Sequence, residues 1–268
     1  HVLLSGPPGL GKTTLARLIA KALHSQIHVT SGPAIERQGE LAAILTHLGQ
    51  GNVLFIDEIH RLKKPLEELL YTAMEQFALD VMIGEGPKAR AVRLPLNPFT
   101  LIGATTRQGL LSAPLRSRFA LSFHLDFYHF KELGQILDHY AKQWGMSISQ
   151  EGLEELARCA KGTPRVGLSL LKRVRDYAQV SRVARIDREL VIKALALNGV
   201  DIHGLNSMDR KILSVMIEKF HGGPVGIETI ASAIMEERDT IEDVYEPYLL
   251  REGIIHKTPR GRVVTERG

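Results

Sequence analysis

The sequence predicts an α/β fold: a parallel sheet surrounded by helices, followed by a small helical domain and a winged helix. Three observations lead to this. Short apolar runs alternate with helical patterns over residues 1–126, which is typical of a parallel sheet. From Phe130 to about Leu197 the pattern is purely helical. From Ser207 onward, three helical patterns precede two short β-like runs. We therefore expect domains at residues 1–126, 127–202 and 203–268.

The first domain is expected to contain five core strands, at His1–Ser5, Gln26–Val29, Val53–Asp57, Thr100–Ala104 and Leu121–Phe123. Helical patterns lie between them at Thr13–Ala22, Leu41–Leu48 and Pro65–Phe77. Two further β-like runs, Asp80–Ile83 and Ala91–Leu94, interrupt this alternation. The Gly/Pro-rich link between them, from Gly84 to Pro87, indicates a β-hairpin inserted before the fourth strand.

The remaining elements are mostly helical. The second domain is expected to contain four helices, at Phe130–Trp144, Ser149–Ala160, Pro164–Val183 and Asp187–Leu197. After the linker Asn198–Asp201, helices are expected from Ser207 to about Phe220, at Ile227–Ile234 and at Thr240–Glu252. The β-like runs Ile254–His256 and Val263–Thr265 follow, and this order is the plan of a winged helix.

The composition excludes several classes of protein. Cys159 is the only cysteine, which excludes an internal disulfide and a cysteine-based metal cluster, and we expect it to be buried in a helix. The eleven histidines show no metal-ligand spacing. No apolar run approaches the roughly 18–20 residues that a membrane span needs. The chain begins at His1, inside an expected strand, so upstream residues are expected to be missing.

Gly6–Thr13 matches the phosphate-binding pattern G-x-x-x-x-G-K-[ST] between an apolar strand and a helical pattern. Glycines let backbone N–H groups surround the phosphates, and the helix that follows presents its positive end to them. Lys12 is expected to reach the β and γ phosphates, and the Thr13 hydroxyl to bind Mg²⁺. The residues expected to hold ATP or ADP here are Gly6, Gly9, Leu10, Gly11, Lys12, Thr13 and Thr14.

Two carboxylates end the apolar run Val53–Asp57 and follow it directly. Asp57 is expected to hold Mg²⁺ through its hydration shell, and Glu58 to orient and deprotonate the attacking water. Thr105 and Thr106 end the fourth expected strand, where a hydroxyl could contact the γ-phosphate or that water.

Arginines farther along the chain could complete the site. Arg116 and Arg118 precede the fifth expected strand, and arginines in such positions commonly reach the nucleotide of a neighbouring subunit. Surface salt bridges are the alternative. Arg165 begins a helix of the second domain and could reach the γ-phosphate, or be an ordinary exposed arginine.

Taken in order, these motifs resemble those of AAA+ ATPases, and more narrowly the RuvB family of Holliday-junction branch-migration motors. The resemblance covers nearly the whole chain. Its segments are GPPGLGKTTLA (6–16), VTSGPAIE (29–36), LFIDEIHRL (54–62), GATTR (103–107), APLRSRF (113–119), GTPR (162–165), GGPVG (222–226) and EPYLLREG…TPRGRV (246–263).

The resemblance implies roles for individual residues. Thr106 matches sensor 1, Arg118 the arginine finger that acts on a neighbouring subunit, and Arg165 the sensor 2 arginine. Tyr128 matches a tyrosine beside the nucleotide. Glu75, Gln76 and Phe77 match a segment that also lies by the nucleotide, although the family often has Asp where Gln76 stands. The family's adenine-contacting residues precede the first strand.

The resemblance also implies partners. The hairpin Asp80–Leu94 matches the family's RuvA-binding hairpin, with Val81, Met82, Ile83 and Val92 as its apolar contacts. A hairpin folded onto its own domain is the alternative. The resemblance further implies duplex DNA and Holliday junctions as substrates, RuvC as another partner and a homo-oligomeric, hexameric ring. It also implies a role in recombination, repair and the SOS response in the bacterial cytoplasm.

The winged helix is expected to contact DNA through its turn. Residues 207–268 carry nine Lys/Arg and eleven Asp/Glu, so this domain is not basic as a whole. Cations gather instead at the turn of the ribbon, His256–Arg262, where Lys257, Arg260 and Arg262 would bind phosphates with little sequence preference. The acidic third helix argues against base reading in the major groove. A solvated basic turn is the alternative.

Other functions fit parts of the sequence. Asp57–His60 reads D-E-x-H, as in two-domain helicases, but no second P-loop-like core follows Phe123. A clamp loader or a protein-remodelling AAA+ ATPase would share the first domain. A nucleotide-gated DNA-binding regulator with little turnover is the non-enzymatic alternative, although it would not need Lys12, Thr13, Asp57, Glu58 and Arg118 together.

Overall fold

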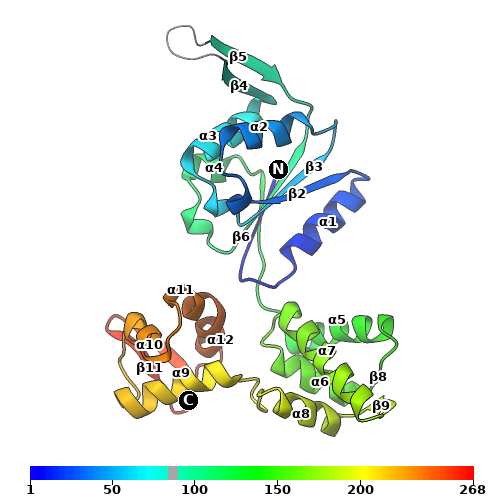
Figure 1. Cartoon of the computed structure of the whole chain (residues 1–268), viewed down its shortest axis with the longest axis vertical. Helices are drawn as coiled ribbons and strands as arrows, with labels where there is room; N and C mark the ends of the chain where they lie inside the picture. The colour runs from blue at the N-terminus through cyan, green and yellow to red at the C-terminus, as the bar shows by residue number, and fades with distance from the viewer. Residues whose placement is uncertain (84–89) are drawn as a thin grey trace. The chain divides into compact units, whose positions relative to one another are not determined.

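The computed structural model describes residues 1–83 and 90–268, and the side chains of residues 1–80 and 92–268. The chain forms two compact units (Figure 1). The first contains His1–Pro7 and Gly11–Asp126, and the second Pro8–Leu10 and Phe127–Gly268. A parallel sheet in the first unit and helices in the second confirm the predicted α/β class.

Five parallel strands form the sheet of the first unit, in the order β2-β3-β6-β1-β7. Val2 pairs with both Ile102 and Leu121, so strands β6, β1 and β7 lie in register and end at one edge. Each strand lies within two residues of its expected bounds: β1 Val2–Ser5, β2 Ile27–Ser31, β3 Val53–Asp57, β6 Thr100–Thr105 and β7 Leu121–His124.

Helices cover both faces of this sheet because successive residues of a strand point to opposite faces. Val2 and Leu4 belong to the cluster that includes Ala16 and Ala20 of α1 (Lys12–Ala22). Leu3 belongs to the larger cluster that includes residues of α2 (Gln38–Thr46) and α3 (Lys64–Gln76). The two clusters hold the P-loop strand β1 from both sides.

Two helices of the first unit differ from expectation. α2 begins three residues earlier than the apolar pattern suggested, because the Glu40 carboxylate accepts the backbone N–H groups of Glu36 and Arg37 at 2.8 and 3.3 Å. These contacts cap the helix start and lower the pKa of Glu40. The short helix α4 (Ala113–Ser117) was not expected, since a single turn shows no periodicity.

The inserted hairpin consists of strands β4 (Ala78–Ile83) and β5 (Arg90–Pro95), paired antiparallel from Ala78↔Pro95 to Ile83↔Arg90. Its base packs on the first unit through the buried Leu79. Val92 is half-buried. The link Gly84–Pro87 and the side chains of Val81, Met82 and Ile83 lie outside the described residues.

The second unit begins with a four-helix domain whose fully buried residues include Leu137, Leu156 and Val174. Its helices are α5 (Phe130–Gln143), α6 (Gln150–Cys159), α7 (Pro164–Val180) and α8 (Arg188–Leu197). The short strands β8 (Ser147–Ile148) and β9 (Arg185–Ile186) pair in parallel.

The winged helix contains α9 (Ser207–Phe220), α10 (Ile227–Ile234), α11 (Arg238–Thr240), α12 (Glu246–Arg251) and the antiparallel strands β10 (Ile255–Thr258) and β11 (Gly261–Val264). The helix expected over Thr240–Glu252 is present as a continuous helical stretch from Arg238 to Arg251, but it is not α-helical throughout. A π-helical turn at Ile241–Tyr245 lies within it, just before Pro247. Proline has no N–H to continue the α-helical hydrogen bonds, which favours such an interruption.

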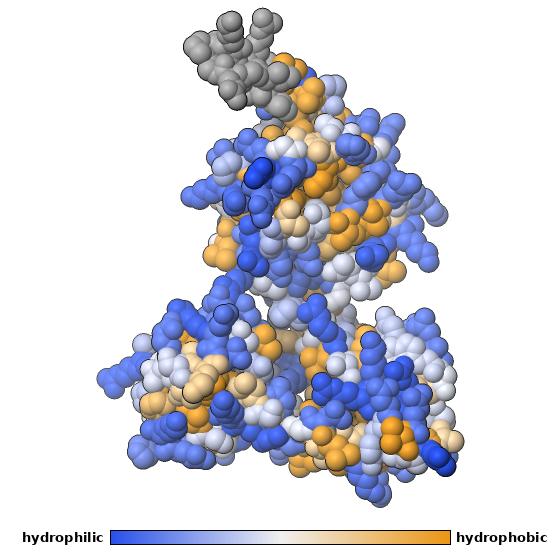
Figure 2. Space-filling model, viewed as in Figure 1, coloured by the Kyte–Doolittle hydropathy of each residue, from blue (hydrophilic) through white to orange (hydrophobic). Residues whose placement is uncertain are grey.

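Hydrophilic surface predominates on the face shown in Figure 2, with separate hydrophobic areas on each unit. Among the described residues, no helix is both long enough and apolar enough to cross a membrane.

Candidate nucleotide site

The P-loop follows β1 and precedes α1, as expected. Gly6 and Gly11 have φ angles of 134° and 95°, in the region that glycine tolerates best. A Cβ on Gly6 would lie 2.2 Å from the Leu125 carbonyl oxygen, so no larger residue fits there. The Lys12 side chain is buried, and its ammonium donates to the Gly6 and Pro7 carbonyls at 2.8 Å each. The lysine therefore lies across the loop that would enclose the phosphates.

Two strands, β3 and β6, bring the other polar residues to this edge. Asp57 ends β3, Glu58 follows it, and Thr106 follows β6. The Thr13 hydroxyl lies 3.5 Å from Asp57 Oδ2, and the Thr106 hydroxyl donates to Glu58 Oε2 at 3.1 Å. Glu58 has a left-handed φ of 47°, which turns the chain sharply after the strand. Thr14 is exposed on the first turn of α1.

Thr13 and Asp57 suit a magnesium ion. Both present oxygen atoms, and the second oxygen of Asp57 is oriented by the Glu58 backbone N–H at 3.0 Å. Mg²⁺ prefers oxygen ligands and usually keeps several waters, so two protein oxygens beside a phosphate are enough. Among the described residues, no group of three or more His, Cys, Asp or Glu side chains could hold a metal by itself.

Arg118 lies at the opposite edge of the sheet from the P-loop of its own chain. It precedes β7, and the backbone N–H of Leu121 donates to the carbonyl of His1, where β1 begins. β1 has four residues, so about 13 Å of strand separates this edge from Gly6. Arg118 Nη2 lies 3.1 Å from Glu75 Oε2, and its buried Nε has no hydrogen-bond acceptor among the described residues.

The segment Glu75–Phe77 also lies at the edge of Arg118, so the structure does not bring it to the P-loop of its own chain. The Gln76 side chain accepts a hydrogen bond from Arg93 Nη2 at 2.6 Å. The Phe77 ring lies 6.3 Å from that of His1 and 5.8 Å from that of Phe99. Any contact of this segment with nucleotide therefore requires another subunit.

The second unit groups the remaining residues expected at the nucleotide. Its segment Pro8–Leu10 contacts both Tyr128 and Arg165. The Tyr128 hydroxyl lies 3.5 Å from the Leu10 carbonyl, and the Arg165 backbone N–H donates to the Gly9 carbonyl at 3.3 Å. A Cβ on Gly9 would lie 2.7 Å from Thr163 Cγ2. Gly9 is therefore required for this packing as well as for the loop.

The structure corrects one expected DNA contact, Arg262. This residue is 7% exposed and does not lie at the wing turn. Its guanidinium binds Glu246 and also Glu242, whose Oε1 lies 3.0 Å from Nη2. Hydrogen bonding to Glu246 raises the pKa of Arg262. Burial would raise the pKa of Glu242, but the hydrogen bonds from Arg238 and Arg262 lower it.

Lys257 on β10 and Arg260 on the wing turn are both exposed, in agreement with a phosphate-binding tip. The Thr258 hydroxyl donates to the Gly261 carbonyl at 2.8 Å and closes the turn. A Cβ on Gly261 would lie 2.4 Å from the Val225 carbonyl oxygen. The glycine therefore lets the wing pack against the segment before α10.

The four-helix domain and the winged helix share contacts at Lys161. Its ammonium forms an ion pair with Asp209, whose side chain is fully buried. The same ammonium lies 4.9 Å from the centre of the Tyr248 ring. The Lys161 carbonyl accepts a hydrogen bond from Arg251 Nη1 at 3.3 Å. These contacts connect the winged helix to the turn that leads to Arg165.

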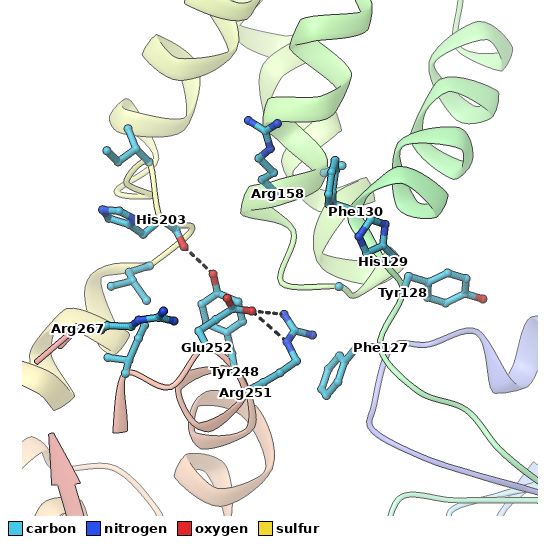
Figure 3. Close-up of a pocket in the computed structure, with 15 residues that line it drawn as sticks. Phe127, Tyr128, His129, Phe130, Arg158, His203, Tyr248, Arg251, Glu252 and Arg267 are labelled. Carbon is cyan, nitrogen blue, oxygen red and sulfur yellow. Dashed lines mark hydrogen bonds and ion pairs between the residues drawn. The ribbon is translucent and has the colours of Figure 1, made fainter. Parts of the chain in front are cut away.

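A cavity of about 760 Å³ lies beside these contacts, within the second unit (Figure 3). Arg251 stacks on Phe127, with 4.6 Å between guanidinium carbon and ring centre, and pairs with Glu252 at 3.0 Å. The Tyr248 hydroxyl donates to the His203 carbonyl at 2.6 Å. Arg251 thus already contacts Phe127, Tyr248 and Glu252 within this lining.

Burial shifts two nearby groups. It raises the pKa of Tyr248 to about 12 and that of the Cys159 thiol to about 11. Cys159 is buried in α6, as expected, and its Sγ lies 3.7 Å from the Asp201 carbonyl oxygen. Neither group is suited to proton transfer at neutral pH.

Sequence patterns did not assign His60 to the site, although it contacts Glu58 and Thr105. Its only signal was the D-E-x-H spacing, which pointed to a different class of helicase. The contact depends on the pairing of β3 with β6, which brings Thr105 beside residues that follow Asp57.

Comparison with known proteins covers the whole chain. Residues 1–125 match the model of the Holliday junction DNA helicase RuvB P-loop domain. Residues 128–201 match that of the RuvB AAA lid domain, and residues 202–268 that of the RuvB C-terminal winged helix domain.

Curated relatives and solved structures agree. The Holliday junction branch migration complex subunit RuvB of Thermotoga petrophila is 53% identical over 267 residues, covering 100% of this chain and 80% of the relative. The subunit of the same name from Latilactobacillus sakei is 57% identical over 268 residues, with the same coverages. The solved Thermotoga maritima RuvB Holliday junction branch migration motor is 50% identical with a TM-score of 0.89, covering 100% of this chain and 85% of that one. This chain belongs to the RuvB family.

Proposed function

We infer that this chain is an ATP-dependent DNA translocase that drives branch migration of Holliday junctions in a ring with RuvA as partner. One observation supports this most directly. Lys12, Asp57, Glu58 and Thr106 meet at one edge of the sheet, whereas Arg118 lies at the other edge of the same sheet. This arrangement suits subunits that complete one another's sites around a ring.

The residues at the carboxyl edge would perform the hydrolysis. Glu58 would orient the attacking water and take its proton, and Thr106 would hold one oxygen of that carboxylate. Lys12 would leave the loop carbonyls for the phosphates, where its charge stabilises the transition state. Thr13 and Asp57 would hold Mg²⁺, which neutralises phosphate charge when bound.

Arginines and neighbouring residues would report the state of the nucleotide. Arg118 of one subunit would reach the γ-phosphate bound by the next, with Glu75, Gln76 and Phe77 beside it. Arg165 would serve as sensor 2 and Tyr128 would lie by the nucleotide. The contact of Arg165 with Gly9 and the contact of Tyr128 with Leu10 support this assignment.

We assign the domains as residues 1–126 (ATPase), 127–202 (lid) and 203–268 (winged helix). The hairpin β4–β5 would bind RuvA through Val81, Met82, Ile83 and Val92, and the wing would grip duplex DNA through Lys257 and Arg260. The ring would be a hexamer in the bacterial cytoplasm. It would act in recombination, repair and the SOS response, with RuvC as a further partner.

Branch migration of a synthetic Holliday junction tests this function. With ATP, Mg²⁺ and RuvA, the chain should dissociate the junction into duplexes and hydrolyse ATP faster when the junction is present. Lys12→Ala is the control that should abolish both activities. A slow ATPase rate that neither junction DNA nor Arg118→Ala changes would favour the nucleotide-gated regulator instead.

A further inference from the structure

His60 contacts Glu58, the candidate catalytic base. It is part of the 3₁₀ turn Ile59–Arg61, directly after Glu58, and its side chain is 8% exposed. Its Nδ1 lies 3.2 Å from Glu58 Oε2 and 2.9 Å from Thr105 Oγ1. One ring nitrogen therefore faces two oxygens that come from neighbouring strands.

The two oxygens determine which form of the ring is present. A lone pair on Nδ1 would repel an ionised Glu58 carboxylate at 3.2 Å, so Nδ1 must carry a hydrogen. Thr105 Oγ1 accepts the backbone N–H of Arg107 at 3.0 Å and, with it, the Nδ1–H of His60. Thr105 is fully buried, so this acceptor is fixed in place. The hydrogen-bond acceptors that face Nδ1 thus set the tautomer of the His60 ring.

Glu58 needs such support. Its side chain is 33% exposed, and a glutamate with that freedom can adopt several rotamers. Its Oε2 receives two donors, the Thr106 hydroxyl at 3.1 Å and the His60 ring. Since both donors act on the same oxygen from different elements, they restrict the rotation of the carboxylate. A general base must stay within hydrogen-bond reach of its water.

We propose that His60 is a positioning residue for ATP hydrolysis. Its Nδ1–H, held by Thr105, fixes Oε2 of Glu58 together with Thr106, and thereby orients Oε1 toward the attacking water. The role rests on the proposed function of Glu58 as the base. His60 reaches Glu58 and Thr105 and is not among the residues expected to hold the nucleotide, so its loss should change turnover and not nucleotide affinity.

Three substitutions separate the hydrogen bond from the volume of the ring. In His60→Asn, the amide nitrogen can occupy the position of Nδ1 and donate to the same oxygens. In His60→Gln, the amide lies farther from the backbone, near the position of Nε2. Glutamine thus fills the space of histidine better than asparagine does but does not place its donor at the position of Nδ1. His60→Leu fills space but donates nothing. His47→Leu is the matched control, because His47 is exposed at the end of α2 and its Nδ1 hydrogen-bonds to the Ala43 carbonyl one helical turn earlier.

The full chain is assayed for ATP hydrolysis with RuvA and junction DNA, and for binding of a fluorescent ATP analogue. His60→Leu and His60→Gln should lower kcat by about 100-fold with unchanged nucleotide affinity, since small misplacements of a reacting group have effects of this size. His60→Asn should recover most of the turnover, and His47→Leu should behave as the unsubstituted chain.

Three outcomes overturn the proposal. The first is an unchanged kcat in His60→Leu, and the second is a loss in His60→Asn as large as in His60→Gln. The third is nucleotide binding that falls together with kcat, which would make the role of His60 structural. Glu58→Gln separates this failure from that of the proposed function. Turnover that depends on Glu58 but not on His60 removes only the positioning role, whereas turnover independent of Glu58 contradicts the hydrolytic site itself.

Discussion

Arg262 and Glu246 form a buried, two-point ion pair beneath the wing, with 2.5 Å between Nε and Oε1 and 3.1 Å between Nη2 and Oε2. Arg262→Met should lower the free energy of unfolding by about 3–5 kcal/mol, because it leaves the Glu246 carboxylate buried without its cation. Urea unfolding at neutral pH measures this. Arg260→Met, on the exposed turn, is the control and should change stability by less than about 0.5 kcal/mol. Equal effects of the two would contradict the assignment of Arg262 to the core.

Substitutions of the exposed cations of the wing should change DNA binding, whereas Arg262→Met should change stability. Lys257→Ala with Arg260→Ala should weaken duplex binding and reduce the slope of log affinity against log salt by about 1 per residue, since each phosphate contact releases counterions. Fluorescence anisotropy over a salt series measures the slope. Lys193→Ala, an exposed cation on α8, should leave it unchanged. A double variant with unaltered affinity would show that DNA binds elsewhere.

Mixing two inactive variants tests whether Arg118 acts between subunits. Arg118→Ala alone should lower turnover by about 10³-fold or more, as expected for an arginine finger. Lys12→Ala alone should lose turnover through its own P-loop. Mixed rings should regain part of the ATPase rate, because a subunit with intact Lys12 can receive Arg118 from a neighbour. The experiment compares the mixture with each variant at equal total concentration. If the mixture is no more active than its components, Arg118 does not complete another subunit's site.

The Lys161–Asp209 pair should stabilise the junction between the lid and the winged helix. Lys161→Met should lower the free energy of unfolding by about 3–5 kcal/mol, because Asp209 is fully buried. Adding Asp209→Asn should recover part of that loss, since the unpaired charge is removed. A double-mutant cycle by urea unfolding measures the coupling. Additive effects of the two substitutions would mean that the pair contributes no coupling energy.

Local patterns predicted the fold well because each element carries its own signal. The apolar runs at Val2–Ser5 and Val53–Asp57 became buried strands, and the glycines of the P-loop adopted the conformations that the motif requires. The P-loop, Asp57, Glu58 and Thr106 could be placed at one edge because parallel strands share a direction. The class of the fold and the clustering of these polar residues at one edge were therefore accessible from sequence.

Features that depend on pairing between distant residues were not accessible. Arg262 looked like a wing-tip cation because the sequence does not show that residue 262 pairs with Val225 and turns its side chain onto α12. The acidic residues Glu242 and Glu246 looked repulsive to DNA for the same reason, although they neutralise that arginine. His60 and Thr105 likewise meet only through the register of two strands separated by more than forty residues.

The sheet places Gly6 and Arg118 at opposite edges, so in the proposed ring every subunit would both donate an arginine and accept one. In an open row of subunits, the acceptor at one end lacks an arginine and the donor at the other end has no nucleotide to reach. An open row therefore has one fewer complete site than it has subunits. Closing the row supplies the missing site without adding a chain. Hydrolysis per subunit would therefore rise as the row lengthens and would reach its maximum only when the last gap is closed.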